Sequence, residues 1–260
     1  MIPRLAGILN LTPDSFSDGG RYLDPQRAIA RGLKLREEGA DWVDVGGEST
    51  RPGAEPVPVE EELRRVVPVV AALTDAGIPV SIDTRRHQVA SEALRAGAVV
   101  LNDISGFRDP RMVELAAEHG AGAVVMHMRG EPQTMQRDTD YADLLGAVRD
   151  FLRPPIQALQ AAGVQEIWAD PGIGFGKSTQ GNLELLRRLP ELDLGVPLYV
   201  GASRKRFIAE IAGDCPADQR LGGSLAAAAL AYKAGAQVLR VHDIAQTRQL
   251  LRVLEAGAWA

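Results

Sequence analysis

The sequence predicts a (β/α)8 barrel, or TIM barrel, as a single domain over residues 1–260. Eight short apolar runs alternate with amphipathic stretches, which is typical of parallel strands connected by helices. Glycines follow several of the expected helices shortly before the next strand, as helix C-caps do. The chain length of 260 residues also suits such a barrel, which typically takes about 250. A doubly wound open sheet is the alternative that the same alternation allows.

The expected elements follow from the period of the apolar residues. In chain order the strands span residues 6–11, 42–46, 80–83, 99–104, 122–128, 167–169, 198–201 and 238–242. Helical patterns span residues 24–38, 60–75, 86–96, 111–119, 141–162, 182–189, 219–234 and 245–255. The expected C-cap glycines are Gly39, Gly97, Gly120, Gly163 and Gly235. We expect Pro154 and Pro155 to interrupt the fifth helix, because the second ring removes a backbone donor and clashes with the preceding turn.

The composition narrows the classes of function. Hydrophobic residues make up 45% of the chain and charged residues 24%, which fits a globular protein with a substantial core. The net charge of −5 argues against general nucleic-acid binding. Cys215 is the only cysteine, so no disulfide can form within one chain and we expect a reducing, cytoplasmic location. The sequence shows no signal-peptide pattern and no apolar tract of membrane-spanning length, so we expect no membrane association.

In a barrel the functional residues lie in the loops that follow the strands, and residues 168–178 form the most distinctive of these loops. The chain leaves a buried strand at Asp170 and continues with Pro171 and three alternating glycines. The segment is no P-loop, because Pro171 stands where the first glycine is required. It is no dinucleotide fingerprint either, because Lys177 replaces the last glycine. We expect a carboxylate held beside a loop that fits closely around a ligand, with a flexible surface turn as the alternative.

Polar residues also end most of the other expected strands. They are Asn10, Thr50 with Arg51, Asp83, Asn102, Lys205, Arg240 and His242. Strand alternation places the side chains of Arg240 and His242 on one face, so both can reach the same oxyanion. The loops after strands seven and eight are the usual phosphate site of such barrels. Taken singly, each polar residue could instead be a helix cap, a turn residue or a surface charge.

The fifth strand contains Met126, His127 and Met128, and alternation sends the two methionines to the opposite side from the histidine. Met126 could line a flat aromatic ligand with its thioether. We interpret His127 as a hydrogen-bonded buried histidine. The four histidines lack the paired spacing of a metal site, and the segment 201–205 lacks the last glycine of a nucleophile elbow. Covalent acyl chemistry is therefore not expected.

Two long motifs resemble those of one enzyme family. Residues 10–20 read Asn-Leu-Thr-Pro-Asp-Ser-Phe-Ser-Asp-Gly-Gly, and residues 47–53 read Gly-Glu-Ser-Thr-Arg-Pro-Gly. With segments 44–53, 81–84, 101–106, 126–130, 170–178, 203–207 and 240–243 they resemble dihydropteroate synthase, the folate-pathway enzyme that sulfonamides target. The matches come in the family's order across nearly the whole chain. Leu11 stands where valine is more usual.

This resemblance implies condensation of 6-hydroxymethyl-7,8-dihydropterin diphosphate with 4-aminobenzoate, SN1-like and with Mg²⁺ on the leaving diphosphate. It implies a catalytic set of Asp83, Lys205, Arg240 and His242. It implies a pterin pocket of Asp83, Asn102, Met126, Asp170, Gly201 and Lys205. It implies diphosphate contacts from Asn10, Thr50, Arg51, Arg240 and His242, with Asn10 on the metal, and 4-aminobenzoate contacts from Pro52, Phe175 and Ser203. We also expect loops 11–21 and 47–58 to close over the site, and the chain to form a homodimer.

Three alternatives remain open at this point. A pterin-binding methyltransferase domain shares the barrel and the pterin residues, but it does not need the cations of a diphosphate site. A non-catalytic paralogue would bind pterin or a partner without turnover. An unrelated phosphate-binding barrel isomerase would not need the acids and the amide that suit an aminopyrimidinone.

Overall fold

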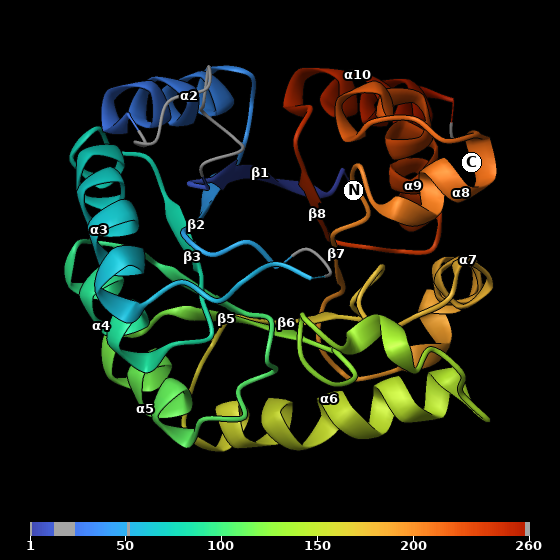
Figure 1. Ribbon diagram of the computed structural model, residues 1–260, viewed down its shortest axis with the longest axis horizontal. Coiled ribbons are helices and arrows are strands. Elements are labelled where there is room, and N and C mark those ends of the chain that lie inside the picture. The colour runs from blue at the N-terminus through green and yellow to red at the C-terminus, as the bar shows by residue number, and fades with distance from the viewer. Residues whose placement is uncertain (1, 13–23, 51–52, 258–260) are drawn as a thin grey trace.

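The computed structural model describes residues 2–12, 24–50 and 53–257, and it confirms the predicted barrel (Figure 1). Eight parallel strands form the central ring: β1 (Arg4–Asn10), β2 (Trp42–Gly46), β3 (Val80–Asp83), β4 (Val100–Asp103), β5 (Gly122–Met126), β6 (Ile167–Asp170), β7 (Tyr199–Val200) and β8 (Val238–Val241). The surrounding helices are α2 (Pro25–Glu37), α3 (Val59–Asp75), α4 (His87–Arg95), α5 (Pro110–His119), α6 (Leu144–Ala161), α7 (Thr179–Arg188), α8 (Arg206–Ala212), α9 (Leu221–Lys233) and α10 (Ile244–Ala256). Three short 3-10 segments are η1 (Met135–Arg137), η2 (Leu189–Leu192) and η3 (Ala217–Gln219).

The sheet closes on itself. Its strand order is β6-β5-β4-β3-β2-β1-β8-β7, so β1 pairs with both β2 and β8. The two ends of this order meet where Ala169 of β6 forms a parallel bridge to Leu198, and the Ala169 amide donates to the Pro197 carbonyl at 2.9 Å. A doubly wound sheet is open, so each of its two outer strands would have one unpaired edge. The closed ring therefore excludes that alternative.

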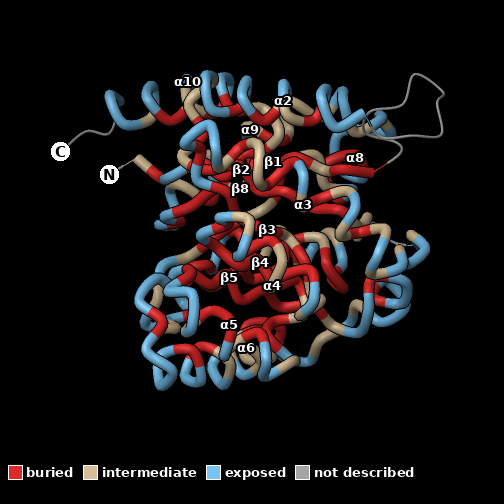
Figure 2. Tube along the Cα trace, turned by 90° about the vertical axis from the view of Figure 1, so that its left-hand side faces the viewer, coloured by how far each residue is buried: buried red, intermediate tan, exposed pale blue. Residues whose placement is uncertain are grey.

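Strand alternation separates two sets of side chains. Outward-facing residues such as Leu9 and Ile82 pack beneath the helices in one large apolar cluster, and the strands run through the buried centre of the molecule (Figure 2). A second buried cluster contains Trp42 and Trp168, whose ring centroids lie 5.6 Å apart. The Arg4 guanidinium covers both rings, at 5.1 and 5.0 Å from their centroids. Because Arg4, Trp42 and Trp168 precede the carboxyl ends of their strands, they fill the barrel below the polar strand ends.

The helix ends follow the expected local chemistry. Side chains cap four helix N-termini by accepting from backbone amides of the first turn: Asp24, Asp109, Asp143 and Ser178. All five expected C-cap glycines have φ between 61° and 103°, a region that favours glycine. The glycines at the helix C-termini were predicted from the sequence, and their φ values confirm the prediction.

The expected break in the fifth helix is wrong. Helix α6 runs without interruption from Leu144 to Ala161 and contains both Pro154 and Pro155. Pro154 is exposed and Pro155 is half-buried, so the carbonyls that lose their amide partners lie toward water. Burial of the opposite face, which includes Leu152 and Ile156, holds the helix together.

One helix was not predicted. The seven-residue α8 lies between β7 and α9, in a stretch that the sequence pattern left unassigned. It is too short to show an apolar period, although it buries Phe207 and Ile208. No helix within the described ranges is long and apolar enough to cross a membrane.

Candidate active site at the carboxyl ends of the strands

Strand register brings several of the predicted site residues to the same end of the barrel. Asn10 pairs with Gly46, Gly46 with Asp83, and Asp83 with Asn102, so these residues form one row across β1 to β4. On the far side of the ring, Met126 pairs with Asp170. The carboxyl ends of the strands thus gather two carboxylates and two amide side chains at one opening.

Gly201 connects the two sides of this opening. A methyl group at Gly201 would lie 3.6 Å from Arg240 Cβ and 3.8 Å from a carboxylate oxygen of Asp170. Glycine therefore lets β7 pass between these two side chains without filling the space that separates them. This position suits a ligand that contacts both residues.

Arg240 forms the centre of a buried charge cluster. Its Nε donates to Asp44 Oδ2 at 2.5 Å, and its Nη2 donates to Asp83 Oδ2 at 2.7 Å. Asn102 Nδ2 lies 3.2 and 3.4 Å from the two oxygens of Asp44, which is completely buried. Asp44, Asp83, Asn102 and Arg240 therefore form one connected network in the barrel interior.

Burial and the neighbouring charges shift the pKa values of this network. Burial raises the pKa of Asp83 to about 7, while Arg240 opposes the rise and Asp44 adds to it. Burial disfavours the charge on Arg240, yet Asp44 and Asp83 together raise its pKa above the usual value. The guanidinium thus stays charged, whereas Asp83 titrates close to neutral pH.

Asp170 and Lys205 form the second charged pair of the opening. The Gly172 amide donates to Asp170 Oδ1 at 2.7 Å and thereby orients the carboxylate. Burial raises the pKa of Asp170 to about 6, although the Gly172 amide and the charge of Lys205 favour ionisation. Burial lowers the pKa of Lys205 to about 7, with Arg240 lowering it further and Asp170 raising it. These two groups also titrate near neutrality.

An apolar wall borders the charged residues. Met126, Met128, Ile104, Met135 and Phe175 form a small cluster of their own. The Lys205 ammonium lies 3.8 Å from the centroid of the Phe175 ring, a cation–π contact. Polar and apolar surfaces therefore meet at Phe175, as a site for a planar heterocycle requires.

Strands β7 and β8 present a further hydrogen-bonded pair. Ser203 Oγ lies 3.0 Å from His242 Nδ1, and the His242 backbone amide donates to the same hydroxyl at 3.3 Å. The next residue along, Arg204, pairs with Asp243 at 2.6 Å and adopts φ 58°. Ser203 is thus held by two contacts from a single residue, His242, which follows the end of β8.

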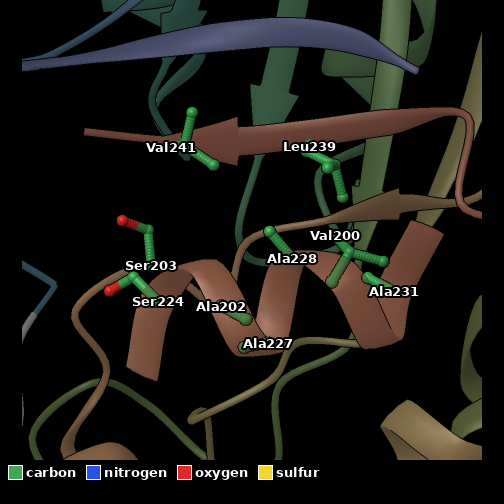
Figure 3. A pocket seen from close by; sticks show the side chains of 9 residues that line it. All are labelled: Val200, Ala202, Ser203, Ser224, Ala227, Ala228, Ala231, Leu239 and Val241. Atoms are coloured by element: carbon green, nitrogen blue, oxygen red, sulfur yellow. The ribbon is translucent and has the colours of Figure 1, made fainter. Parts of the chain in front are cut away.

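A small cavity lies behind Ser203, between the β7–β8 pair and α9 (Figure 3). Alanines of α9, among them Ala227 and Ala228, line it together with Val200 and Leu239. Its volume of about 10 Å³ is that of roughly one water molecule. It cannot accept an organic ligand and forms no part of the site.

The loop after β2 is only partly described. Thr50 is half-buried, and two residues earlier Glu48 accepts hydrogen bonds from Arg85, Arg86 and the Val57 amide. These contacts anchor both ends of the loop. The expected ligands Arg51 and Pro52 lie outside the described residues, as does most of loop 11–21, so their predicted roles and loop closure stay predictions.

Comparisons with known proteins agree with this geometry. The model of the pterin binding enzyme family matches residues 6–242. Dihydropteroate synthase of Synechocystis is 47% identical over 255 residues, 96% of this chain and 88% of that enzyme. The structure of Xanthomonas albilineans dihydropteroate synthase with 4-aminobenzoic acid has a TM-score of 0.92 and 46% identity, and covers 100% of this chain and 94% of that one. The chain belongs to the dihydropteroate synthase family.

A Thermus thermophilus dihydropteroate synthase solved in complex with 6HMPPP is also similar. Its TM-score is 0.86 at 46% identity, with coverage of 98% of this chain and 94% of that one. The family resemblance expected from the motifs is thereby confirmed, and so are the fold and the class of transferase. The matched region includes all eight strands except the first two residues of β1, and it contains every carboxyl-terminal strand end described above.

Two parts of this dihydropteroate synthase site were missed from the sequence. Asp44 was not named as a site residue from the sequence. An acid at an inward-facing position of an otherwise apolar strand is nevertheless a signal of function. His127 was expected to be an ordinary buried histidine, and it is indeed buried and hydrogen-bonded, but its partner is the buried Lys177. A lysine next to a glycine-rich loop gives no sign in sequence that it turns inward.

Proposed function

We propose that the protein condenses 6-hydroxymethyl-7,8-dihydropterin diphosphate with 4-aminobenzoate to give 7,8-dihydropteroate and diphosphate. The observation that carries this proposal is the gathering of acids and cations at the barrel opening, where Arg240 contacts Asp83 and Lys205 contacts the apolar wall at Phe175. Relatives of 46% identity that were solved with 6HMPPP and with 4-aminobenzoic acid support it.

The pterin ring binds, in this proposal, between Asp170 and the Asp44–Arg240 network. The pyrimidinone edge of a pterin presents an amide and an amino group, and a carboxylate such as Asp170 accepts from both. Asn102 both donates and accepts, while Asp83 and Lys205 complete the polar contacts. Met126 and the space beside Gly201 accommodate the ring itself.

The diphosphate lies, in this proposal, on the side of β1, β2 and β8. Asn10, Thr50, Arg51, Arg240 and His242 supply its contacts, and Arg240 and His242 oppose the negative charge that grows as the C–O bond breaks. A Mg²⁺ ion would be held by Asn10 and by the substrate phosphates, and when bound it would neutralise charge on the leaving diphosphate. Asn10 ends β1 and is half-buried there, and its side-chain carbonyl is a type of oxygen ligand that suits Mg²⁺.

In this proposal 4-aminobenzoate attacks the methylene carbon of the pterin after diphosphate has left. The C–O bond to diphosphate breaks first, the electron-rich pterin supports the resulting positive charge, and the amine of 4-aminobenzoate forms the C–N bond and releases a proton. Phe175, Ser203 and Pro52 position 4-aminobenzoate in this proposal. Exclusion of water by the loops 11–21 and 47–58 protects the cation from capture by water.

The remaining expectations follow the family. We expect the enzyme to act as a homodimer in the cytoplasm, with only these small molecules as substrates. Light scattering on the purified chain measures its mass in solution and thereby tests the expected homodimer. A mass of one chain would contradict it.

Product formation tests the proposal directly. The protein, Mg²⁺, the pterin diphosphate and 4-aminobenzoate are incubated together and with each component omitted in turn, and dihydropteroate is detected by mass spectrometry. We expect dihydropteroate and diphosphate in equal amounts only when both substrates are present. Tight pterin binding without product would instead indicate a non-catalytic paralogue.

A further inference from the structure

We propose that Lys177 is a positioning residue for the reaction, because its buried ammonium fixes the loop 171–176 that carries Phe175 and orients the Asp170 carboxylate. This inference rests on the proposed function of the barrel opening. It concerns a residue that contacts neither substrate in that proposal and that belongs to no part of the charge cluster around Arg240.

The surroundings of Lys177 match an ammonium group. Only 3% of the residue is exposed, and its Nζ lies 2.8 Å from His127 Nδ1, 2.9 Å from the Gly172 carbonyl oxygen and 2.8 Å from the Phe175 carbonyl oxygen. An ammonium has three N–H donors, and these three acceptors lie within 2.9 Å of it, while the His127 carbonyl oxygen lies farther away at 3.5 Å. A buried charge so fully hydrogen-bonded fixes the groups that surround it.

The acceptors connect Lys177 to both sides of the opening. Lys177 holds the Gly172 peptide by its carbonyl oxygen, and the amide of that same residue donates to Asp170 Oδ1 at 2.7 Å. Lys177 also holds the Phe175 carbonyl, and the Phe175 ring contacts the Lys205 ammonium. Displacement of Lys177 would therefore disturb the pterin carboxylate and the apolar wall together.

The loop has little freedom to compensate. Gly172 adopts φ 67°, and a Cβ atom there would lie 1.9 Å from the His127 carbonyl oxygen. Asn182 accepts from the Gly174 amide at 2.6 Å, and Tyr141 donates to the Gly176 carbonyl at 2.9 Å. The loop backbone thus contacts its surroundings closely on several sides, with Lys177 in its centre.

The electrostatics of Lys177 act on Asp170. Burial lowers the pKa of Lys177 to about 7, while Asp170 raises it and Lys205 lowers it. In return, the charges of Lys205, Lys177 and Arg240 lower the pKa of Asp170, against its burial and together with its bond from the Gly172 amide. Lys177 therefore helps to keep Asp170 ionised, which is the form that accepts hydrogen bonds from a pterin.

His127 completes the arrangement as an acceptor. Burial lowers the pKa of His127 to about 2, and the charges of Lys177, Arg108 and Arg129 act in the same direction. The imidazole is consequently neutral. Its Nδ1 accepts a hydrogen bond from the Lys177 ammonium, while Nε2 carries the ring proton. Phe151 packs edge-on against the ring at 5.0 Å between centroids and fixes its plane.

The test compares three variants of similar size. Lys177→Met removes the charge and keeps the chain length, Lys177→Arg keeps a charge with a different geometry, and Lys233→Met changes an exposed lysine at the end of α9 as the control. For each, kcat and KM are measured for both substrates, and pterin binding is titrated calorimetrically between pH 5 and 8.

We expect Lys177→Met to lower kcat/KM by about 100-fold, since a misplacement of about 1 Å can cost that much. The acid limb of pterin binding, which is the low-pH range where affinity falls as Asp170 is protonated, should also move up by about 1 pH unit. The reason is that Asp170 loses a neighbouring cation. Lys177→Arg should lower kcat/KM and leave the acid limb in place. A merely structural role would lower stability without moving this limb, so a folded Lys177→Met protein with an unmoved limb overturns the proposal.

A second pair of variants decides the matter if Lys177→Met does not fold. His127→Leu keeps the ammonium and removes one acceptor, and pterin affinity should fall about tenfold, the worth of one hydrogen bond to a charged group. His127→Asn retains an acceptor oxygen and should stay close to wild type. Equal affinities for these two variants would overturn the proposal. Failure of the proposed function is distinguishable, because wild type and Lys233→Met would then both form no dihydropteroate, whereas pterin titration would still report on Lys177.

Discussion

The Arg240→Met substitution tests the charge cluster in the barrel. It removes a guanidinium that contacts both Asp44 and Asp83, of which Asp44 is completely buried and the Asp83 side chain is 11% exposed. Breaking a buried ion pair by removing one partner costs about 3–5 kcal/mol of unfolding free energy. Because the Arg240 side chain is itself 17% exposed, we expect the lower end, about 3 kcal/mol at pH 8.5.

The loss depends on pH in a defined direction. The pKa of Asp83 is raised to about 7 in the folded protein, from 3.8 in the absence of the fold. Between these two pH values the folded state binds more protons than the unfolded state, so the free energy of unfolding falls as pH rises through that window. Arg240 lowers this pKa, so its removal raises it further and makes the ionised form more costly. The destabilisation should therefore be smaller at pH 5.5, where Asp83 takes up a proton, than at pH 8.5.

Urea unfolding of wild type and variant at pH 5.5, 7 and 8.5 measures the effect. The matched control is Arg248→Met, which breaks the more exposed pair of Arg248 with Asp41 and should cost about 0–1 kcal/mol at each pH. A loss for Arg240→Met that is below about 1 kcal/mol, or equal at pH 5.5 and 8.5, would refute the reasoning.

Three further predictions concern the loop after β6 and its partners. Gly172→Ala should destabilise the fold by more than about 3 kcal/mol in thermal or urea unfolding, because the new methyl group meets the His127 carbonyl. The control Gly195→Ala, at φ 70° with open space around it, should cost about 1–2 kcal/mol. Equal losses for the two variants would contradict this prediction. Pterin affinity measured by calorimetry should fall below pH about 6, where Asp170 becomes protonated, and above pH about 7, where Lys205 loses its proton, and a flat profile from pH 5 to 8 would contradict these assignments. Phe175→Leu should raise the KM for 4-aminobenzoate by about fivefold with little change for the pterin substrate, since ring contacts of this kind are worth about 1 kcal/mol. A larger effect on the pterin KM would contradict the assignment of Phe175 to 4-aminobenzoate.

The sequence predicted the barrel well because its signals are local. Alternating strands and helices, C-cap glycines and strand-end acids each depend on a few neighbouring residues. Pairing register was not readable, yet register is what aligns Asn10, Gly46, Asp83 and Asn102 in one row. The uninterrupted α6 shows the same limit, because burial of its far face outweighs the local cost of Pro154 and Pro155.

Residues of the candidate site could be named from the sequence, but their contacts with one another could not. Arg240 was expected to face a diphosphate, and the structure adds that it lies between two carboxylates. The Lys177–His127 contact joins residues 50 positions apart, and no period or motif in the sequence announces it. Such long-range polar pairs depend on how strands and loops meet in space, which single-residue patterns do not encode.

One calorimetric titration tests the central claim that the opening divides the substrate between a pterin side and a diphosphate side. Wild type, Asp170→Asn and His242→Ala are each titrated with the pterin diphosphate and with the corresponding pterin alcohol in the presence of Mg²⁺. We predict that Asp170→Asn weakens both ligands by about 100-fold, because it removes two charge-assisted hydrogen bonds, while His242→Ala weakens the diphosphate by about tenfold and leaves the alcohol within about twofold. Equal losses of both ligands in His242→Ala, or unchanged binding in Asp170→Asn, would contradict the account.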